Sequence, residues 1–337
     1  MATAEQLKAL IKSHTSSNDE HFRTVALQIA AHTAKQGNTR LADELRALVE
    51  EGRRKQATAG TPRAIPIARP SGELAGLVAA SYPNTRLIDM VLTESIRHQL
   101  EEAVQQHRQR DRLRTHGFAP KRRLLLVGPP GCGKTMTATA LAGECQLPLM
   151  FVQLHSLITK YMGETAAKLH VVFDAMAETR GVYLFDEFDA IGATRTAGND
   201  VGEIRRVLNS FLQFMERDDS DSIIVAATNF MEMLDDALFR RFDDVIRYSP
   251  PNSKAIRSLI ESRLSSFTLT GLRWQKLLTA AKGLSHAEVA RSCDAAARTT
   301  ILGGDTTLTG DQLVQALSAR SGMRLHSPKS RKKTSHD

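Results

Sequence analysis

Gly128-Pro-Pro-Gly-Cys-Gly-Lys-Thr135 is the stretch that decides the fold of this 337-residue chain. It fits the pattern G-x-x-x-x-G-K-[ST], with an apolar run, Leu124–Val127, before it and a helix-forming stretch, MTATALAGEC, after it. Glycines let backbone N–H groups wrap around a phosphate without a side-chain clash, and the helix N-terminus adds the positive end of its dipole. We therefore predict a strand, a phosphate-binding loop and a helix, in that order.

The residues of this loop have separate predicted roles. Lys134 is placed to reach the β- and γ-phosphates of a nucleotide, and the Thr135 hydroxyl is placed to ligate Mg²⁺. We expect ATP and Mg²⁺ as the cofactors. The residues predicted to bind the nucleotide are Gly128, Pro129, Pro130, Gly131, Cys132, Gly133, Lys134, Thr135 and Met136.

Two further apolar runs end in polar residues. Gly181-Val-Tyr-Leu-Phe185 is followed by Asp186 and Glu187, and strand ends in open α/β sheets face the ligand crevice. We expect Asp186 to hold Mg²⁺ and Glu187 to orient or deprotonate the attacking water. Ile223–Thr228 is followed by Asn229, whose amide either lies between the γ-phosphate and this water or belongs to an ordinary turn.

Short apolar runs alternate with helical stretches from Arg123 onward, which is typical of a parallel sheet with crossover helices. We predict an α/β fold, with one long helix from about Thr93 to Arg114 before the sheet and only helices after Ser253. The predicted regions are an N-terminal helical domain at 1–55, a Pro-, Gly- and Ala-rich linker at 56–86, a nucleotide-binding α/β region at 87–248, a helical region at 249–320 and a basic disordered tail at 321–337.

Composition argues against several classes of protein. No apolar run approaches the roughly 18–20 residues that span a bilayer, and the N-terminus lacks a signal-peptide core, so we expect a cytoplasmic protein without membrane contact. Cys132, Cys145 and Cys293 have neither an even count nor metal-like spacing, which argues against disulfides and zinc. The net charge of +8 is diffuse, so it permits anionic partners without identifying one.

Together with Leu234–Asp243, the three strand-end motifs resemble the AAA family of ATPases, over about Asp89 to Arg320. The resemblance implies ATP hydrolysis, a helical lid after the α/β region, and a ring of subunits, which we expect to be a hexamer. By this resemblance Asn229 is the sensor-1 residue, and the two arginines reach the nucleotide of the neighbouring subunit. The catalytic residues that it implies are Glu187, Asn229, Arg240 and Arg241.

The chain departs from the family pattern in two places. It lacks the residues that many relatives carry between the two arginines, so the division of work between Arg240 and Arg241 stays open. Gly-Leu-Ser-His-Ala at 283–287 replaces the Gly-x-Ser-Gly-Ala of many relatives at the start of the third lid helix. His286 either faces the nucleotide or only neighbours a helix-capping serine, and Arg291 is a candidate second sensor.

Lys160-Tyr-Met-Gly-Glu164 resembles the first pore loop of protein-remodelling AAA rings. An aromatic side chain offers a large apolar area with few rotatable bonds, so Tyr161, with Met162 beside it, is suited to grip an extended polypeptide. The alternative is a core tyrosine near a turn. The Gly- and Thr-rich stretch Ala193–Glu203 is either a second pore loop or a plain surface loop.

Three functions stay open on the sequence alone. The first is a ring-forming remodeller, unfoldase or chaperone that acts on protein clients. The second is an ATP-dependent switch that restrains or activates one dedicated partner, because residues 19–45 resemble the leader of stand-alone bacterial AAA ATPases often encoded beside a subtilisin-like serine protease. The third is a DNA-associated motor with phosphate contacts from the basic stretch Arg97–Arg123 and from the basic tail, although a basic face is more often simply solvated.

Overall fold

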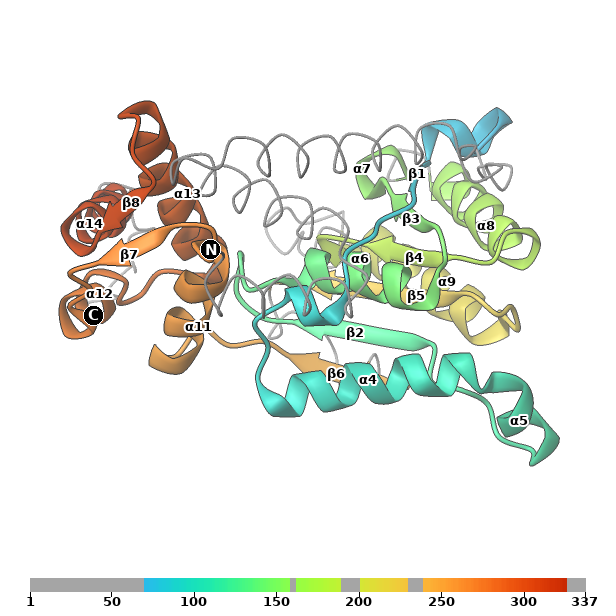
Figure 1. Cartoon of the computed structure of the whole chain (residues 1–337). Helices are drawn as coiled ribbons and strands as arrows, with labels where there is room; N and C mark the ends of the chain where they lie inside the picture. The colour runs from blue at the N-terminus through green and yellow to red at the C-terminus, as the bar shows by residue number, and fades with distance from the viewer. Residues whose placement is uncertain (1–69, 158–161, 189–200, 230–238, 326–337) are drawn as a thin grey trace, which may run out of the picture. The chain divides into compact units, whose positions relative to one another are not determined.

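The computed structural model describes residues 70–157, 162–188, 201–229 and 239–325 of the chain (Figure 1). The chain divides into two compact units, Met1–Ile67 and Ala68–Asp337, and every described residue belongs to the second. The predicted N-terminal helical domain at 1–55 lies outside the described residues. No helix in the described ranges is both long and apolar enough to cross a membrane.

A six-stranded sheet forms the centre of the second unit, with the strand order β1-β3-β4-β5-β2-β6. Every neighbouring pair is parallel except the edge pair of β1 and β3, which is antiparallel. This mostly parallel sheet confirms the predicted α/β class. The strands are β1 (Val78–Ser81), β2 (Arg123–Val127), β3 (Leu149–Val152), β4 (Val182–Phe185), β5 (Ile223–Thr228) and β6 (Asp244–Arg247).

Helices cover both faces of the sheet, so the inner strands β4 and β5 are apolar and buried along their whole length. In β2, Leu125 and Val127 face one hydrophobic cluster while Leu124 and Leu126 face the other. The first cluster is closed by α8 (Met162–Glu178) and α9 (Val201–Arg217), and the second by α4 (Glu94–Arg108) and α6 (Lys134–Cys145). The remaining helices of this part are α5 (Arg110–Thr115), α7 (Leu154–Leu157) and the short 3₁₀ turns Gly72–Gly76 and Leu87–Asp89.

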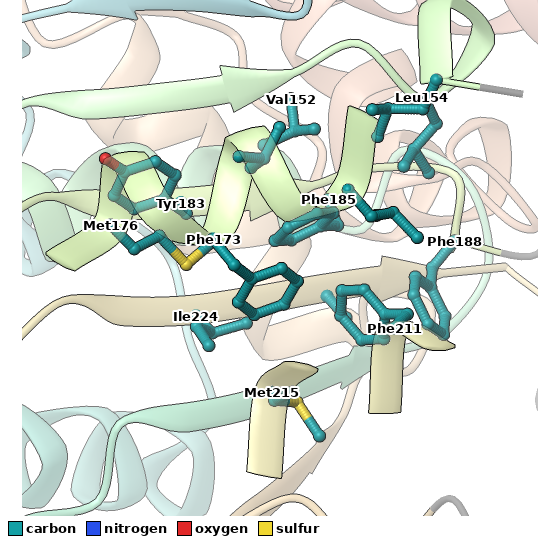
Figure 2. Packing of buried hydrophobic residues seen from close by; sticks show 14 of the residues in the cluster. Val152, Leu154, Phe173, Met176, Tyr183, Phe185, Phe188, Phe211, Met215 and Ile224 are labelled. Carbon is teal, nitrogen blue, oxygen red and sulfur yellow. The ribbon is translucent and has the colours of Figure 1, made fainter. Parts of the chain in front are cut away.

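Aromatic rings fill the first cluster, as Figure 2 shows. The Phe211 ring lies 4.9 Å, centroid to centroid, from both Phe185 and Phe188, and Phe173 packs on Phe185 at 6.3 Å. Phe185 and Phe188 flank the predicted acidic pair directly in sequence. The packed rings therefore fix the backbone on both sides of that pair.

Four helices follow the sheet: α11 (Ser253–Arg263), α12 (Trp274–Ala280), α13 (His286–Leu302) and α14 (Gly310–Leu325). They enclose their own apolar core, so this part forms the expected helical lid. The prediction of helices alone was wrong in one detail, because β7 (Thr268–Thr270) and β8 (Thr307–Thr309) form a two-stranded parallel ladder. Both strands read Thr-Leu-Thr, and three residues are too few for a periodic signal.

Three predicted boundaries differ from the structure. Part of the stretch expected to be linker is core: β1 pairs with β3, and Leu77 and Val78 are buried against α8 and its neighbours. The predicted helix from Thr93 is broken at Gln109, where α4 ends and α5 begins. The expected disordered tail begins within α14, which continues to Leu325.

Candidate active site

The loop between β2 and α6 requires glycine because two other segments press against it. A Cβ atom on Gly128 would lie 2.6 Å from the Tyr248 carbonyl oxygen, and one on Gly131 would lie 2.6 Å from the Ser285 Oγ. Gly131 also has a φ of +75°, which is unfavourable for residues with a side chain. The Ala287 N–H donates to the Gly131 carbonyl oxygen at 3.0 Å, so the lid touches the phosphate-binding loop directly.

Lys134 begins α6 and is buried, with an exposed fraction of 6%. Its Nζ donates to the carbonyl oxygens of Gly128 at 2.7 Å and Pro129 at 3.1 Å, and to the Asn229 Oδ1 at 2.8 Å. A buried ammonium requires such partners, because an unpaired charge in the interior is costly. The structure therefore brings together Lys134 and Asn229, which belong to separate motifs.

Thr135 and Asp186 also meet. The Thr135 Oγ1 donates to the Asp186 Oδ2 at 2.6 Å, and the Glu187 N–H donates to the Asp186 Oδ1 at 2.9 Å. A hydroxyl and a carboxylate oxygen at this separation match neighbouring ligands of Mg²⁺, which binds oxygen at about 2.0–2.1 Å in an octahedron. The pair therefore fits the metal that the motifs imply, and most of the remaining ligands would be water and phosphate oxygens.

Glu187 adopts a left-handed backbone conformation, with a φ of 53°. Such a conformation is unusual for a residue with a side chain and is concentrated at functional sites. Glu187 borders a cavity of about 540 Å³ together with Gln153, His155 and Asp186. It also borders the cavity beside the phosphate-binding loop, so its exposed carboxylate adjoins space that water can enter from either side.

A cavity of about 630 Å³ connects these residues to the lid. This volume lies within the usual range for small-molecule sites. Its wall includes Lys134, Thr135, Asp186, Glu187 and Asn229. Its further lining comes from the loop before α4 and from α11 and α13: Asp89, Met90, Val91, Leu259, Ser262, Arg263, His286, Ala287 and Ala290.

His286 lies next to a helix-capping serine and also lines the cavity, so it combines features of both alternatives. Ser285 is the N-cap of α13, with its side chain accepting from the Glu288 N–H, and His286 lines the cavity. Burial lowers the pKa of His286, so the imidazole is neutral at pH 7. Its Nδ1 is buried and has no hydrogen-bond partner among the described residues.

The predicted finger arginines do not line their own chain's cavity. Arg240 is exposed, and the Arg241 Nε lies 3.3 Å from the Glu216 Oε1 at the end of α9. Tyr161 and the Met162 side chain lie outside the described residues, as do residues 193–200 of the second candidate pore loop. Arg291 is exposed and is not part of the cavity wall, so the structure does not bring it to the site.

Sequence reasoning missed most of the lid and loop residues of the cavity. Met90 and Val91 precede α4 without a motif, and Leu259 and Ala290 belong to ordinary helical apolar positions. Arg263 was missed because a single arginine near a helix end carries no signal of its own. Only the apolar spacing of Ile256, Leu259 and Ile260 indicated that α11 has an inner face.

The fold and this site define a P-loop nucleoside triphosphatase with a helical lid. Residues 124–250 match the model of the ATPase family associated with various cellular activities (AAA). The chain is 35% identical over 303 residues to an uncharacterized AAA family ATPase, y4kL, of Sinorhizobium fredii, and the match covers 90% of each protein. The chain therefore belongs to the AAA family of ATPases, and this membership implies ATP hydrolysis.

Relatives of another kind match part of their length. The chain is 32% identical over 231 residues to the ATP-dependent zinc metalloprotease FtsH of Helicobacter felis, covering 66% of this chain and 36% of that protein. It is 31% identical over 236 residues to FtsH of Helicobacter pylori, covering 67% of this chain and 37% of that protein. The similarity to these FtsH proteins thus extends over little more than a third of their length.

Proposed function

We propose that this chain hydrolyses Mg²⁺-bound ATP in a ring of copies and uses the energy to remodel protein clients. One observation carries the ATPase part: Lys134, Asn229, Thr135 and Asp186, from three separate motifs, form two hydrogen-bonded pairs that line a single cavity. Neighbouring parallel strands β4, β5 and β2 supply all three segments.

The chain's own groups suit phosphoryl transfer to water. Lys134 and the backbone N–H groups of the loop would hold the phosphates, and Thr135 and Asp186 would hold Mg²⁺, whose charge offsets that of the phosphate oxygens. The Glu187 carboxylate would accept a proton from the attacking water. The Asn229 Oδ1 accepts from Lys134, and the side-chain amide would orient the γ-phosphate or the water.

The positions of Arg240 and Arg241 support a ring of subunits. Arg240 and Arg241 lie outside their own cavity, and phosphoryl transfer in this class gains roughly 10³–10⁵-fold from a guanidinium supplied by another molecule. We propose that a neighbouring copy supplies it, in a hexamer. The FtsH proteins, whose name denotes ATP-dependent proteolysis, support a protein client, and Tyr161 with Met162 would contact it.

The DNA-associated alternative receives less support. Two of its candidate phosphate contacts are engaged with acids: Arg108 pairs with Glu144 at 2.9 Å, and Arg114 pairs with Asp221 at 2.6 Å. The switch that restrains a dedicated partner, such as a serine protease, uses the same ATPase chemistry and differs only in its client. A cytoplasmic location is part of the same proposal.

Stimulation of ATP turnover tests the client class. We expect an unfolded protein such as casein to raise the turnover of the full chain, and double-stranded DNA to leave it unchanged. Tyr161→Ala should abolish the stimulation while basal turnover persists. Stimulation by DNA alone would contradict the proposal and favour the alternative motor.

A further inference from the structure

A lid arginine that carries no sequence motif lies at the nucleotide cavity. Arg263 is the last residue of α11, and it borders the same cavity as Lys134. Its side chain is 54% exposed, so solvent and ligands can reach it. Leu259 lies one turn before it on the same face of α11 and also lines the cavity.

Asp294 holds this arginine in a fixed orientation. The Arg263 Nε donates to the Asp294 Oδ1 at 2.7 Å, and the Nη2 donates to the Oδ2 at 3.0 Å. This two-point pair joins α11 to α13, the two helices that form the lid side of the cavity. Hydrogen bonding to Asp294 raises the pKa of Arg263, and the same contact lowers the pKa of Asp294, so both remain charged at neutral pH.

The pair leaves Arg263 with unused donors. A guanidinium has more N–H groups than the two that Asp294 occupies, and those on Nη1 remain. Among the described residues, no further acceptor for Arg263 is found. Asp294 therefore orients the guanidinium while leaving one edge available to a ligand.

Arg263 supplies one of the positive charges in the cavity wall. Lys134 and Arg263 are the permanently charged cations in the described wall, against Asp89, Asp186 and Glu187. Lys134 already donates to three oxygen atoms of the protein. Within the described wall of the cavity, Arg263 is therefore the other permanent cation that a polyphosphate could contact, and it lies on the lid.

We propose that Arg263 donates hydrogen bonds to phosphate oxygens of the bound nucleotide, and that Asp294 is the residue that positions it. The inference rests on the proposed nucleotide site. The sequence suggested Arg291 on α13 as the second sensor. We assign a phosphate-contacting role to Arg263 on α11 instead. Because Arg263 also spans α11 and α13, nucleotide binding stabilises the contact between these two lid helices.

Nucleotide titrations of the full chain test this assignment. Dissociation constants are measured for ATP, ADP and adenosine, with Mg²⁺, in the wild type, Arg263→Ala and Arg263→Lys. We expect Arg263→Ala to weaken ATP and ADP binding on the order of 10-fold, as for a charged hydrogen bond, and to leave adenosine binding unchanged. Arg263→Lys should recover part of the lost affinity, because its ammonium restores the charge but not the planar set of N–H donors of a guanidinium.

Two further variants separate this role from a structural one. Arg291→Ala, an exposed arginine of α13, is the matched control and should bind ATP like the wild type. Asp294→Asn should weaken ATP binding less than Arg263→Ala while leaving adenosine binding unchanged.

Two results would overturn the inference: wild-type ATP affinity in Arg263→Ala, or an equal loss for adenosine and ATP. Lys134→Ala, measured in parallel, isolates the underlying site. If the wild type fails to bind ATP, or Lys134→Ala binds it normally, then the proposed nucleotide site itself is wrong. If the wild type binds ATP and Lys134→Ala does not, the nucleotide site is supported. The affinity of Arg263→Ala then tests only the contact between Arg263 and the phosphates.

Discussion

Lys134 and Asn229 are 95 residues apart in sequence, yet the Lys134 Nζ lies 2.8 Å from the Asn229 Oδ1. The contact exists because β2 and β5 are parallel neighbours, with Val127 beside Thr228 at their carboxyl ends. The segments after the two strands, Asn229 and the phosphate-binding loop that leads to Lys134, therefore reach the same edge of the sheet. This arrangement makes the amide of Asn229 a fixed donor at the phosphate end of the cavity.

Asn229→Asp isolates that donor. The carboxylate keeps an acceptor for Lys134 but lacks the amide N–H groups. We expect ATP to bind with a KM within a few-fold of the wild type, while kcat falls on the order of 10²-fold, as when one transition-state donor is removed. Steady-state phosphate release gives both constants. An unchanged kcat would contradict the assigned role of Asn229.

Arg240 and Arg241 differ in their surroundings, so their substitutions should differ. Arg241 pairs with Glu216, whereas Arg240 has no ion pair among the described residues. We expect Arg240→Ala to lower kcat by roughly 10³-fold or more with little change in nucleotide affinity, and Arg241→Ala to lower it less.

Mixing two inactive variants checks that the arginine acts on a neighbouring copy. Lys134→Ala keeps Arg240 but has no working nucleotide site, whereas Arg240→Ala keeps the site. A mixture should recover measurable turnover, because some interfaces then combine an intact site with an intact arginine. Absence of recovery, in mixtures shown to co-assemble, would argue against action between subunits.

The aromatic cluster packed around the Asp186–Glu187 segment should contribute strongly to the free energy of unfolding. Phe211 is fully buried between Phe185 and Phe188 (Figure 2). We expect Phe211→Ala to lower the free energy of unfolding by about 3–5 kcal/mol. Phe118→Ala is the matched control: its ring is 66% exposed, so the change should be within about 0.5 kcal/mol. Denaturant titration measures both, and equal effects would contradict the packing.

His107 should make stability depend on pH. It is buried in α4, and its Nε2 accepts a hydrogen bond from the Arg180 Nη2 at 2.7 Å. Burial, and then the charges of Arg180 and Arg110, lower the pKa of His107 to about 4. Between this value and the ordinary pKa of about 6.5, the unfolded chain binds a proton that the folded chain excludes.

Stability from this residue is therefore complete above pH 6.5 and is lost as the pH falls toward 4, by up to about 3 kcal/mol. His107→Gln should flatten this part of the profile, because its amide oxygen still accepts from Arg180 but does not titrate. Unfolding free energies at pH 7 and pH 5 for both proteins test the effect. Equal slopes would show that His107 is not responsible.

More of the residues that would contact the phosphates and Mg²⁺ could be identified from the sequence than of the other residues that line the cavity. Asp186 follows the buried strand β4 directly, and the phosphate-binding loop after β2 leads to Lys134 and Thr135, so the sheet and this one loop bring them together. Met90, Leu259 and Arg263 come from a loop and a lid helix, whose approach depends on tertiary packing. No spacing rule indicates which face of a distant helix meets a cavity.

The fold was also predictable in part: the central strands could be predicted from the sequence, whereas the edge strand could not. The buried parallel strands were predictable because continuous apolar runs are distinctive. The edge strand β1 was taken for linker, since Val78–Ser81 is short, follows Pro- and Gly-rich sequence and has only one strand neighbour, β3. Its position depends on pairing with β3, a partner that lies about 70 residues later in the chain.

Turnover and retention of ATP by Glu187→Gln test the central claim most directly. In this variant the phosphate-binding loop, Thr135 and Asp186 are intact, and only the proposed proton acceptor is lost. Phosphate release and filter-retained ATP are measured with Mg²⁺ for the wild type, Glu187→Gln and Lys134→Ala. We predict turnover in the wild type, retained but unhydrolysed ATP in Glu187→Gln, and neither in Lys134→Ala. Hydrolysis by Glu187→Gln at the wild-type rate would contradict the account.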